Sequence, residues 1–238
     1  MEKPTFNLMN DLTAAQWLID NETQWIGEAP NSLAAFVPPI FESYISVRHD
    51  NALGKDEAGL EIDWELFTKL LISFTNNPND CYFALWNGYG IDYEENHPEL
   101  FVERHSLLQM DLQRDYYLFH GKLLDSLNIN FNEPYGHPFM RPNLAWPSDR
   151  SWMYFNEIDF EVALIGGSEA LVTAIEKSPL YKTERFTPET LVKDIFLVAP
   201  WNSGEQSWSP PHLTKGMWLR HRLADRLDRL SWKIRGWL

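Results

Sequence analysis

NLAWPSDRSWMYFNEIDFEVALIGGSEALVTAI, residues 143–175, is the stretch of the chain that decides which fold to expect. Residues 146–150 have the composition of a tight turn, because Pro147 fixes φ and Asp149 accepts hydrogen bonds from nearby backbone readily. Residues 152–165 predict one or two strands, and residues 168–177 predict a short helix that Pro179 stops. Turn, strand, glycine pair and helix follow one another without a linker, which indicates one packed unit.

Within this stretch, the segment Glu157 to Val162 alternates between acidic and apolar side chains. In a strand, Glu157, Asp159 and Glu161 share one face, while the apolar residues fill the core on the other. Such a face is solvated in most exposed sheets. The alternatives are a divalent cation, docking of Lys or Arg from a partner, or acid–base catalysis. We predict no tight metal binding, because three carboxylates without carbonyl or His ligands make a poor cation cage.

Gly166-Gly167-Ser168 joins the expected strand to the expected helix. Paired glycines permit a positive φ and a close approach of backbone, and Ser168 is a suitable N-cap. The segment lacks the Lys of a phosphate loop and the third Gly of a dinucleotide site, so a helix cap is favoured over anion binding. Arg150 is expected in an internal ion pair with the acidic strand; gripping a carboxylate or phosphate is its alternative role.

The rest of the chain contains more expected strands than long helices. Helices are expected at 12–19 and 63–74, the second with Asp63 as its N-cap, and strands at 40–48, 81–86 and 116–120. Residues 123–131 are open between a strand and a loop with some helix. Pro and Gly indicate irregular chain at 25–39, 132–147 and 196–216.

Strands that do not alternate regularly with long helices favour α+β over a doubly wound sheet. We therefore expect a central, mostly antiparallel sheet with flanking short helices and a C-terminal amphipathic helix. Residues 1–214 are expected to form a single α+β domain, and residues 215–238 a basic amphipathic helix docked on it.

The formal net charge of −14 disfavours binding of nucleic acid, since phosphate contacts need clustered Lys and Arg. An acidic surface suits a basic protein partner, or serves solubility. The charge is uneven: residues 215–238 hold seven Lys/Arg against two Asp, which leaves −19 on residues 1–214. The tail also carries an apolar stripe of Trp218, Leu219, Leu223, Leu227, Leu230, Ile234 and Trp237. Docking on the acidic body is favoured over a membrane surface or a partner groove.

Cys81 is the only cysteine, so the chain forms no internal disulfide, and its apolar surroundings predict a buried strand residue. The start of the chain lacks the apolar run of a signal peptide, and no stretch of 18 apolar residues predicts a membrane span. A cytoplasmic location is expected. The seven His show no metal-ligand spacing, so we expect no metal and no cofactor.

Several segments of the middle of the chain resemble an uncharacterised bacterial family that is common in actinobacteria. The resemblance rests on FVPPIFESYISVRHD (36–50), CYFALWNGYG (81–90), YYLFHGKL (116–123), NLAWPSDRSW (143–152) and EIDFEVALIGGSEALVTAI (157–175). That family has no established activity, so the resemblance assigns no role to any residue. A Pro before an aromatic element and a Trp-rich segment with Asn-Gly are also similar to the SMI1/KNR4-like immunity proteins.

Strong negative charge, eleven Trp and the lack of a recognisable catalytic set favour a non-enzymatic interaction domain, in its most concrete form an immunity- or antitoxin-like protein that binds a basic partner. The candidate contact residues are Trp86, Tyr89, Trp146, Asp149, Arg150, Trp152, Glu157, Asp159 and Glu161. Trp152 is alternatively a core residue, if Tyr154 and Ile158 share its inward phase. The rival function is a hydrolase or transferase that uses Asp149, Glu157, Asp159 and Glu161, with or without a divalent metal. A third is a membrane-surface adaptor acting through residues 218–238. The sequence assigns no oligomeric state.

Overall fold

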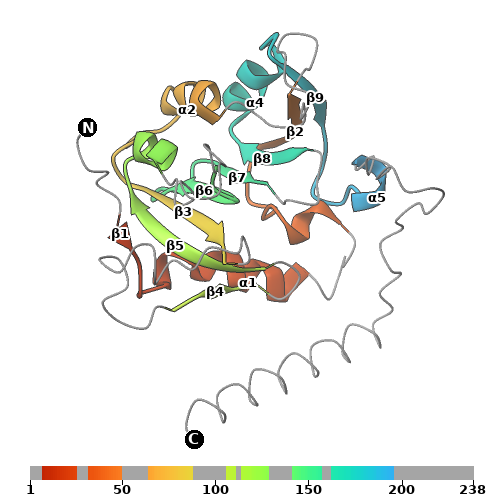
Figure 1. The fold of residues 1–238 in the computed structure, drawn as a ribbon. Helices are drawn as coiled ribbons and strands as arrows, with labels where there is room; N and C mark the ends of the chain where they lie inside the picture. Colours follow the sequence, from red (N-terminus) through yellow and green to blue (C-terminus); the bar gives the residue numbers. More distant parts are fainter. Residues whose placement is uncertain are drawn as a thin grey trace, which may run out of the picture.

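The structure, a computed structural model, describes residues 7–25, 32–49, 64–87, 106–110, 114–128, 141–156 and 162–195. These residues build a nine-stranded sheet in the order β1-β5-β3-β6-β7-β8-β2-β9, with β4 paired to β5 (Figure 1). Every strand pairing in this described part is antiparallel. The expected α+β fold with a mostly antiparallel sheet is confirmed.

The strands are β1 (Asn7–Leu8), β2 (Ser43–His49), β3 (Cys81–Trp86), β4 (Leu108–Gln109), β5 (Asp115–Gly121), β6 (Leu144–Pro147), β7 (Met153–Phe155), β8 (Ala163–Gly167) and β9 (Tyr181–Arg185). The helices are η1 (Thr13–Ala15), α1 (Gln16–Trp25), η2 (Leu33–Ala35), α2 (Trp64–Ile72), η3 (Leu123–Asn128), α4 (Glu169–Glu176) and α5 (Val192–Ile195).

The sheet is buried on both faces, because its central strands carry apolar side chains at odd and even positions alike. In β3, Phe83 joins the core on one face and Ala84 the core on the other. In β7, Tyr154 and Phe155 divide in the same way. Figure 1 shows α2 and α4 on one side of the sheet and α1 on the other. We call these sides the α2 face and the α1 face.

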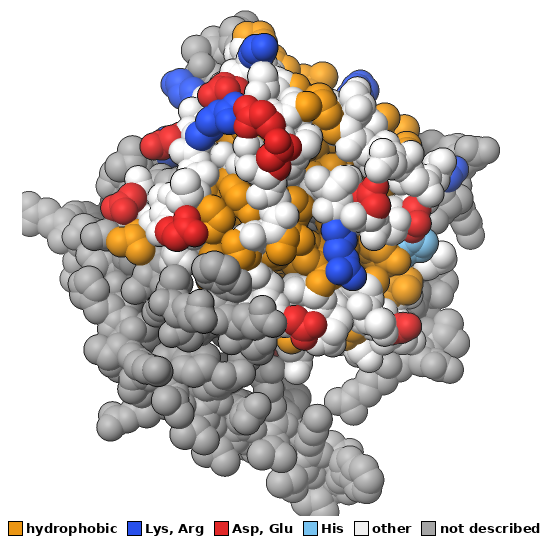
Figure 2. All heavy atoms as spheres, turned by 180° about the vertical axis from the view of Figure 1, so that it is seen from behind, with side chains coloured by type: hydrophobic (Ala, Val, Ile, Leu, Met, Phe, Trp, Pro, Cys, Tyr) orange, Lys and Arg blue, Asp and Glu red, His pale blue; other side chains and the backbone are white. Residues whose placement is uncertain are grey.

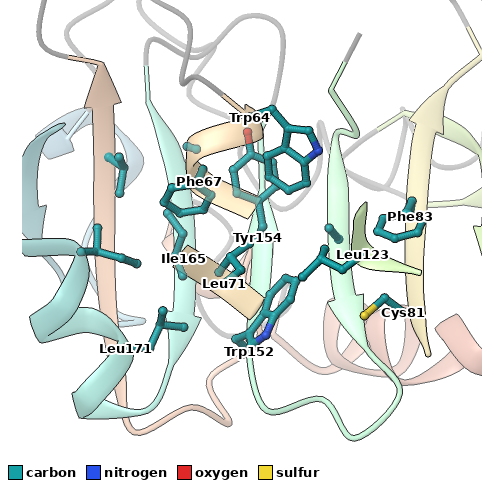
Figure 3. Close-up of a cluster of buried hydrophobic side chains, with 14 of the residues drawn as sticks. Trp64, Phe67, Leu71, Cys81, Phe83, Leu123, Trp152, Tyr154, Ile165 and Leu171 are labelled. Atoms are coloured by element: carbon teal, nitrogen blue, oxygen red, sulfur yellow. The ribbon is translucent and has the colours of Figure 1, made fainter. Parts of the chain in front are cut away.

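The α2 face holds the core drawn in Figure 3. Trp64, Phe67 and Leu71 recur at helical spacing in α2 and lie over the strand residues Tyr154 and Ile165. The ring centroids of Trp64 and Tyr154 are 4.7 Å apart. This packing places the apolar stripe of α2 against the middle of the sheet, as the sequence spacing predicts.

One prediction was wrong in an important place: residues 132–147 are not all surface loop. Leu144–Pro147 form β6, which pairs with β3 on one side and β7 on the other, and its four residues are buried. Pro147 is tolerated because it is the last residue of the strand. Its missing N–H therefore removes no hydrogen bond from the interior of the sheet ladder. A strand this short has too few positions to display a period.

The glycine pair lies at the end of β8 rather than in a hinge. A Cβ on Gly166 would come within 2.3 Å of the Phe41 ring, so this position is glycine because another segment packs against the backbone. Ser168 is the N-cap of α4, as predicted, and its Oγ accepts the N–H of Leu171 at 3.2 Å.

The remaining expectations divide into confirmed elements and residues outside the described part. Strand 81–86 agrees with β3, strand 116–120 with β5 and helix 168–177 with α4, and the strands expected at 152–165 form as β7 and β8, of which β8 continues to Gly167. Residues 123–128 form a 3-10 helix, and the helix expected at 12–19 extends to Trp25. The strand expected at 40–48 forms as β2, which begins at Ser43, so Tyr44 lies in the strand and is buried, whereas Ile40 precedes it and is exposed. Asp63, the acidic segment 157–161 and the tail 215–238 lie outside the described residues.

None of the described helices combines the length and the apolar character that a membrane crossing requires.

Candidate functional site

The structure describes five of the nine candidate contact residues. Trp86, Trp146, Asp149, Arg150 and Trp152 are described, whereas Tyr89, Glu157, Asp159 and Glu161 are not. Of the four acids assigned to the rival hydrolase, Asp149 is thus the one whose surroundings are known.

Two of the five described residues are core residues and do not meet a partner from this position. Trp146 is 1% exposed and Trp152 is 0% exposed. Trp152 packs on the α2 face with Tyr154, which confirms that Trp152 is a core residue, whereas Ile158 lies outside the described residues. Their role as contacts is therefore corrected: a ring without accessible surface stabilises the fold and offers nothing for a partner to bury.

Trp86 is half-buried at the end of β3. The guanidinium of Arg114 lies 4.1 Å from the centroid of its ring, within the range of a cation–π contact. The backbone N–H of Trp86 donates to Asn143 Oδ1 at 2.9 Å. Its ring is therefore already covered in part by a cation of the same chain.

Residues 147–150 form the predicted tight turn. The N–H of Arg150 donates to the Pro147 carbonyl at 2.9 Å, and Asp149 Oδ1 accepts the N–H of Ser151 at 2.9 Å. Asn76 donates its amide to Asp149 Oδ2 at 2.7 Å, which ties the turn to the segment after α2. Arg150 has a φ of 56°, the left-handed conformation that a non-glycine residue seldom adopts.

This turn borders a surface depression of about 410 Å³. Its lining residues come from the segment before α1, from β3 and from the turn: Met9, Asp11, Thr13, Ala14, Tyr82, Ser148 and Arg150. We call these residues, together with Asp80, Asp149 and His120 beside them, the Asp80 surface. Three separate parts of the chain meet here because β3 lies between β5 and β6 in the sheet.

A row of rings crosses the sheet beneath this surface. His120, Tyr82 and Trp146 lie opposite one another on β5, β3 and β6. The Tyr82 ring lies 4.8 Å from the His120 ring and 5.7 Å from the Trp146 ring, and it is stacked on the latter. Trp17 of α1 meets the edge of Trp146 at 6.1 Å, and the Arg150 guanidinium lies 5.3 Å from the Trp17 ring centroid. Cross-strand and cation–π contacts thus hold the half-buried Tyr82 and Trp17 in defined positions.

Asp80 connects the parts of the surface. Its Oδ1 lies 2.7 Å from His120 Nε2, and its backbone carbonyl accepts the N–H of Ser148 at 3.0 Å. Hydrogen bonds from His120 and from the Ser148 side chain hold the pKa of the Asp80 carboxyl below its usual value. The group is therefore an anion at neutral pH.

Burial, hydrogen bonds and nearby charges shift the pKa values of the neighbouring groups Tyr82, Asp11 and Asp149. Burial raises the pKa of Tyr82, and the charges of Asp80 and Asp11 raise it further. Bonds from the Thr13 hydroxyl and N–H lower the pKa of Asp11. For Asp149, burial raises the pKa, but the hydrogen bonds from Ser151 and Asn76 outweigh it and the pKa is lowered. The carboxyls of Asp11, Asp80 and Asp149 are thus all ionised at neutral pH, and the first two lie close enough to act on Tyr82.

The arrangement does not form a nucleophile relay. Ser148 and His120 both bond to Asp80, so the carboxylate lies between them, whereas an activated serine bonds directly to its base. Cys81 lies on the α2 face of the sheet. Tyr82, the next residue in the chain, points to the opposite face, and His120 packs on the Tyr82 ring. Burial raises the pKa of the Cys81 thiol to about 12, far from a reactive thiolate. Among the described residues, no group of three His, Cys, Asp or Glu side chains is placed to hold a metal ion.

Sequence reasoning singled out Asp149 and Arg150 but missed Asp11, Asp80 and Tyr82. The missing signal was strand register, because Tyr82 becomes part of a site only when β5 and β6 bring His120 and the turn beside it. The expected ion pair of Arg150 with the acidic strand involves residues 157–161, which lie outside the described part. Arg150 instead contacts the Trp17 ring.

Comparison of the chain with protein-family models, with curated proteins and with solved structures found no match.

Proposed function

We propose that this protein is a cytoplasmic, non-enzymatic interaction domain that binds a basic protein partner through the Asp80 surface, in an immunity- or antitoxin-like role. The observation that carries the proposal is that Asp11 and the half-buried Tyr82 line one surface depression, with Asp80 close enough to act on Tyr82 and Asp149 in the turn that borders the depression. Carboxylates at such a position attract Lys and Arg, and a fixed aromatic ring gives them apolar surface to cover.

Charge supports this assignment at two scales. The chain carries −14 overall, so a basic partner approaches in a favourable field. At the surface itself, the carboxyls of Asp11, Asp80 and Asp149 all have lowered pKa values, so each is charged at neutral pH. The Arg150 guanidinium is the cation among the lining residues, and it lies over an indole ring.

Rigidity supports it as well. Tyr82 is held between His120 and Trp146, and Trp17 between Trp146 and Arg150, so little side-chain entropy is lost on binding. Tyr, Trp and Arg are the residues most often found at energetic hot spots of protein interfaces. The resemblance to immunity proteins agrees with this kind of surface.

The test is capture of partners from lysate of the cells that make the protein, with three versions of the full chain as bait. The first is unchanged. The second carries Asp11→Asn, Asp80→Asn and Asp149→Asn, which remove charge but keep an acceptor oxygen at each position. The control carries Glu65→Gln, Glu184→Gln and Asp194→Asn, three exposed acids elsewhere that change net charge equally.

We expect the unchanged protein and the control to retain the same protein of high pI, and the second version to lose it. With the purified partner, the second version should associate about tenfold more slowly at low salt, and the difference should shrink as salt is added. Retention of the partner by the second version, equal losses in both variants, or a partner of acidic pI would each refute the proposal. Cooperative melting of all three baits well above the assay temperature shows that folding is not the cause.

A further inference from the structure

A second depression, of about 540 Å³, lies at the other end of the sheet, where β2 pairs with β9. Its lining includes Phe41, Glu42, Tyr44, Phe186, Pro188 and Glu189. With Ile40, which precedes Phe41 in the chain, these residues are here called the Ile40 groove.

The floor of the groove is aromatic, with Tyr44 and Phe186 buried, and charged residues are also part of its lining. The Tyr44 ring lies 6.1 Å from the Phe41 ring and 5.5 Å from the Phe186 ring. The Tyr44 hydroxyl donates to the Pro38 carbonyl and accepts the N–H of Phe41, which fixes the floor. Ile40 is 59% exposed, the highest value among the exposed large apolar residues of the described part. Figure 2 shows one face of the molecule on which hydrophobic side chains lie uncovered between acidic and basic groups.

The charge left at the groove is negative. Arg185, the cation among the lining residues, bonds Glu169 at 2.8 Å and Glu176 at 2.9 Å, so its charge is already neutralised. Glu42 and Glu189 have no cation within salt-bridge distance among the described residues. Glu42 is held in place because its Oε2 accepts the N–H of Glu169 at 3.0 Å. The groove therefore combines the exposed Ile40 and the half-buried Phe41, above the buried Tyr44 and Phe186, with two carboxylates that have no cation partner among the described residues.

The chain leaves the described part beside this groove. Residues 186–189 form one wall, and backbone bonds from Leu33 to Thr190 and from Ala34 to Pro188 anchor that wall on η2. The description ends at Ile195, and residues 196–217 come before the apolar stripe of the tail. Fully extended, such a segment spans about 75 Å, so the tail reaches the groove without strain.

We propose that residues 218–238 of the same chain occupy the Ile40 groove. Leu219, Leu223, Leu227, Leu230 and Ile234 recur at spacings of three and four, which favours an amphipathic helix with one apolar stripe. This stripe covers Ile40 and the half-buried Phe41. Arg226, Arg229 and Lys233 on the flanks meet Glu42 and Glu189.

Tethering and charge favour this occupant over a second copy of the protein. A second copy brings another net charge of −14, whereas residues 218–238 carry six Lys/Arg against two Asp. A tethered segment also acts at an effective concentration in the millimolar range when its linker spans the sites. The proposal is independent of the Asp80 surface and its partner.

The test is zero-length carbodiimide crosslinking of the full chain, read by mass spectrometry. This reagent joins a Lys amine to a carboxyl group only when the two groups are in contact. Protein labelled with ¹⁵N is mixed with unlabelled protein, so links within one chain are separated from links between chains. Ile40→Ser removes the exposed residue at the groove, and Leu124→Ser removes another exposed apolar residue, 48% exposed in η3, as the matched control.

We expect links within one chain from Lys233 to Glu42 or Glu189, at equal yield in the unchanged protein and in Leu124→Ser. Ile40→Ser should lower the equilibrium constant for docking of the tail about fivefold. This is the loss expected when most of one Ile side chain no longer contributes apolar surface to the contact. Were docking absent, Ile40→Ser would be a harmless exposed substitution. Links between chains only, links from Lys233 mainly to other carboxyls, or equal yields in both Ser variants would each overturn the proposal.

Discussion

Trp152 is predicted to stabilise the fold both by its buried ring and by one hydrogen bond, and the two contributions are separable. Its Nε1–H donates to Thr75 Oγ1 at 2.8 Å, and the Thr75 hydroxyl donates to the Leu71 carbonyl at 2.7 Å. The chain of bonds joins β7 to the end of α2, and both side chains are buried. Trp152→Ala removes everything at once, whereas Trp152→Phe removes the N–H and keeps a ring.

The magnitudes follow from burial. Trp152→Ala should lower the free energy of unfolding by about 3–5 kcal/mol, the usual loss for a buried aromatic side chain. Trp152→Phe should lose about 1–2 kcal/mol, because Thr75 still donates to Leu71 and the cavity is small. Thr75→Val should cost about 1–3 kcal/mol, because it leaves the indole N–H buried without an acceptor.

The assay is urea denaturation followed by far-UV circular dichroism, with each single variant and the double variant Trp152→Phe/Thr75→Val. In the Trp152→Phe background there is no indole N–H for Thr75→Val to leave without an acceptor. The double variant should therefore lower the free energy of unfolding by about 1 kcal/mol less than the sum of the two single variants. Shifts are read from midpoints at constant slope, which shows that the unfolded state is unchanged. Strict additivity would refute the hydrogen bond, and an unchanged midpoint in Trp152→Ala would refute the burial.

Three further predictions concern single positions. Gly166→Ala should cost about 1–3 kcal/mol and lower the melting temperature, because its Cβ meets the Phe41 ring at 2.3 Å; an unchanged melting temperature would mean that this ring moves aside freely. The bond from His120 lowers the pKa of Asp80 in the folded state. The stability that this carboxylate contributes is therefore present above its ordinary pKa of 3.8 and is lost as pH falls through the lowered pKa. Asp80→Asn should flatten the acid side of the plot of stability against pH, and an unaltered plot would contradict the pairing of Asp80 with His120. Cys81, with a thiol pKa of about 12, should react with a thiol reagent at neutral pH only at the rate of unfolding; rapid reaction of the native protein would show that the thiol is reachable.

Local sequence patterns predicted an element correctly wherever the signal for that element lies in its own residues. The stripe of α2, the cap residue Ser168 and the buried strand around Cys81 follow from spacing, capping chemistry and β propensity, and the structure agrees with each. The turn at 147–150 was predictable for the same reason, since Pro147 and Asp149 act on their own backbone. In these places the physical cause lies within a few residues of its effect.

Other features were decided only when distant segments met. Leu144–Pro147 ends a Pro-rich segment and is too short to display a period, yet it is the strand between β3 and β7, because its four residues are buried between those strands. Trp146 and Trp152 look alike as exposed anchors in the sequence, and only the packing shows that both are core.

The sequence by itself therefore determined the longer elements, the fold class and the acidic character of the molecule, since these depend on composition and short-range spacing, whereas the short strands β1, β4, β6 and β9 were not predicted. The tertiary structure alone decided that Asp80, Tyr82 and His120 share one surface with the turn at 147–150. The reason is register: a shift of one residue in the pairing of β3 would turn Tyr82 to the other face of the sheet, and no local pattern encodes which residues of β5 and β6 lie opposite it.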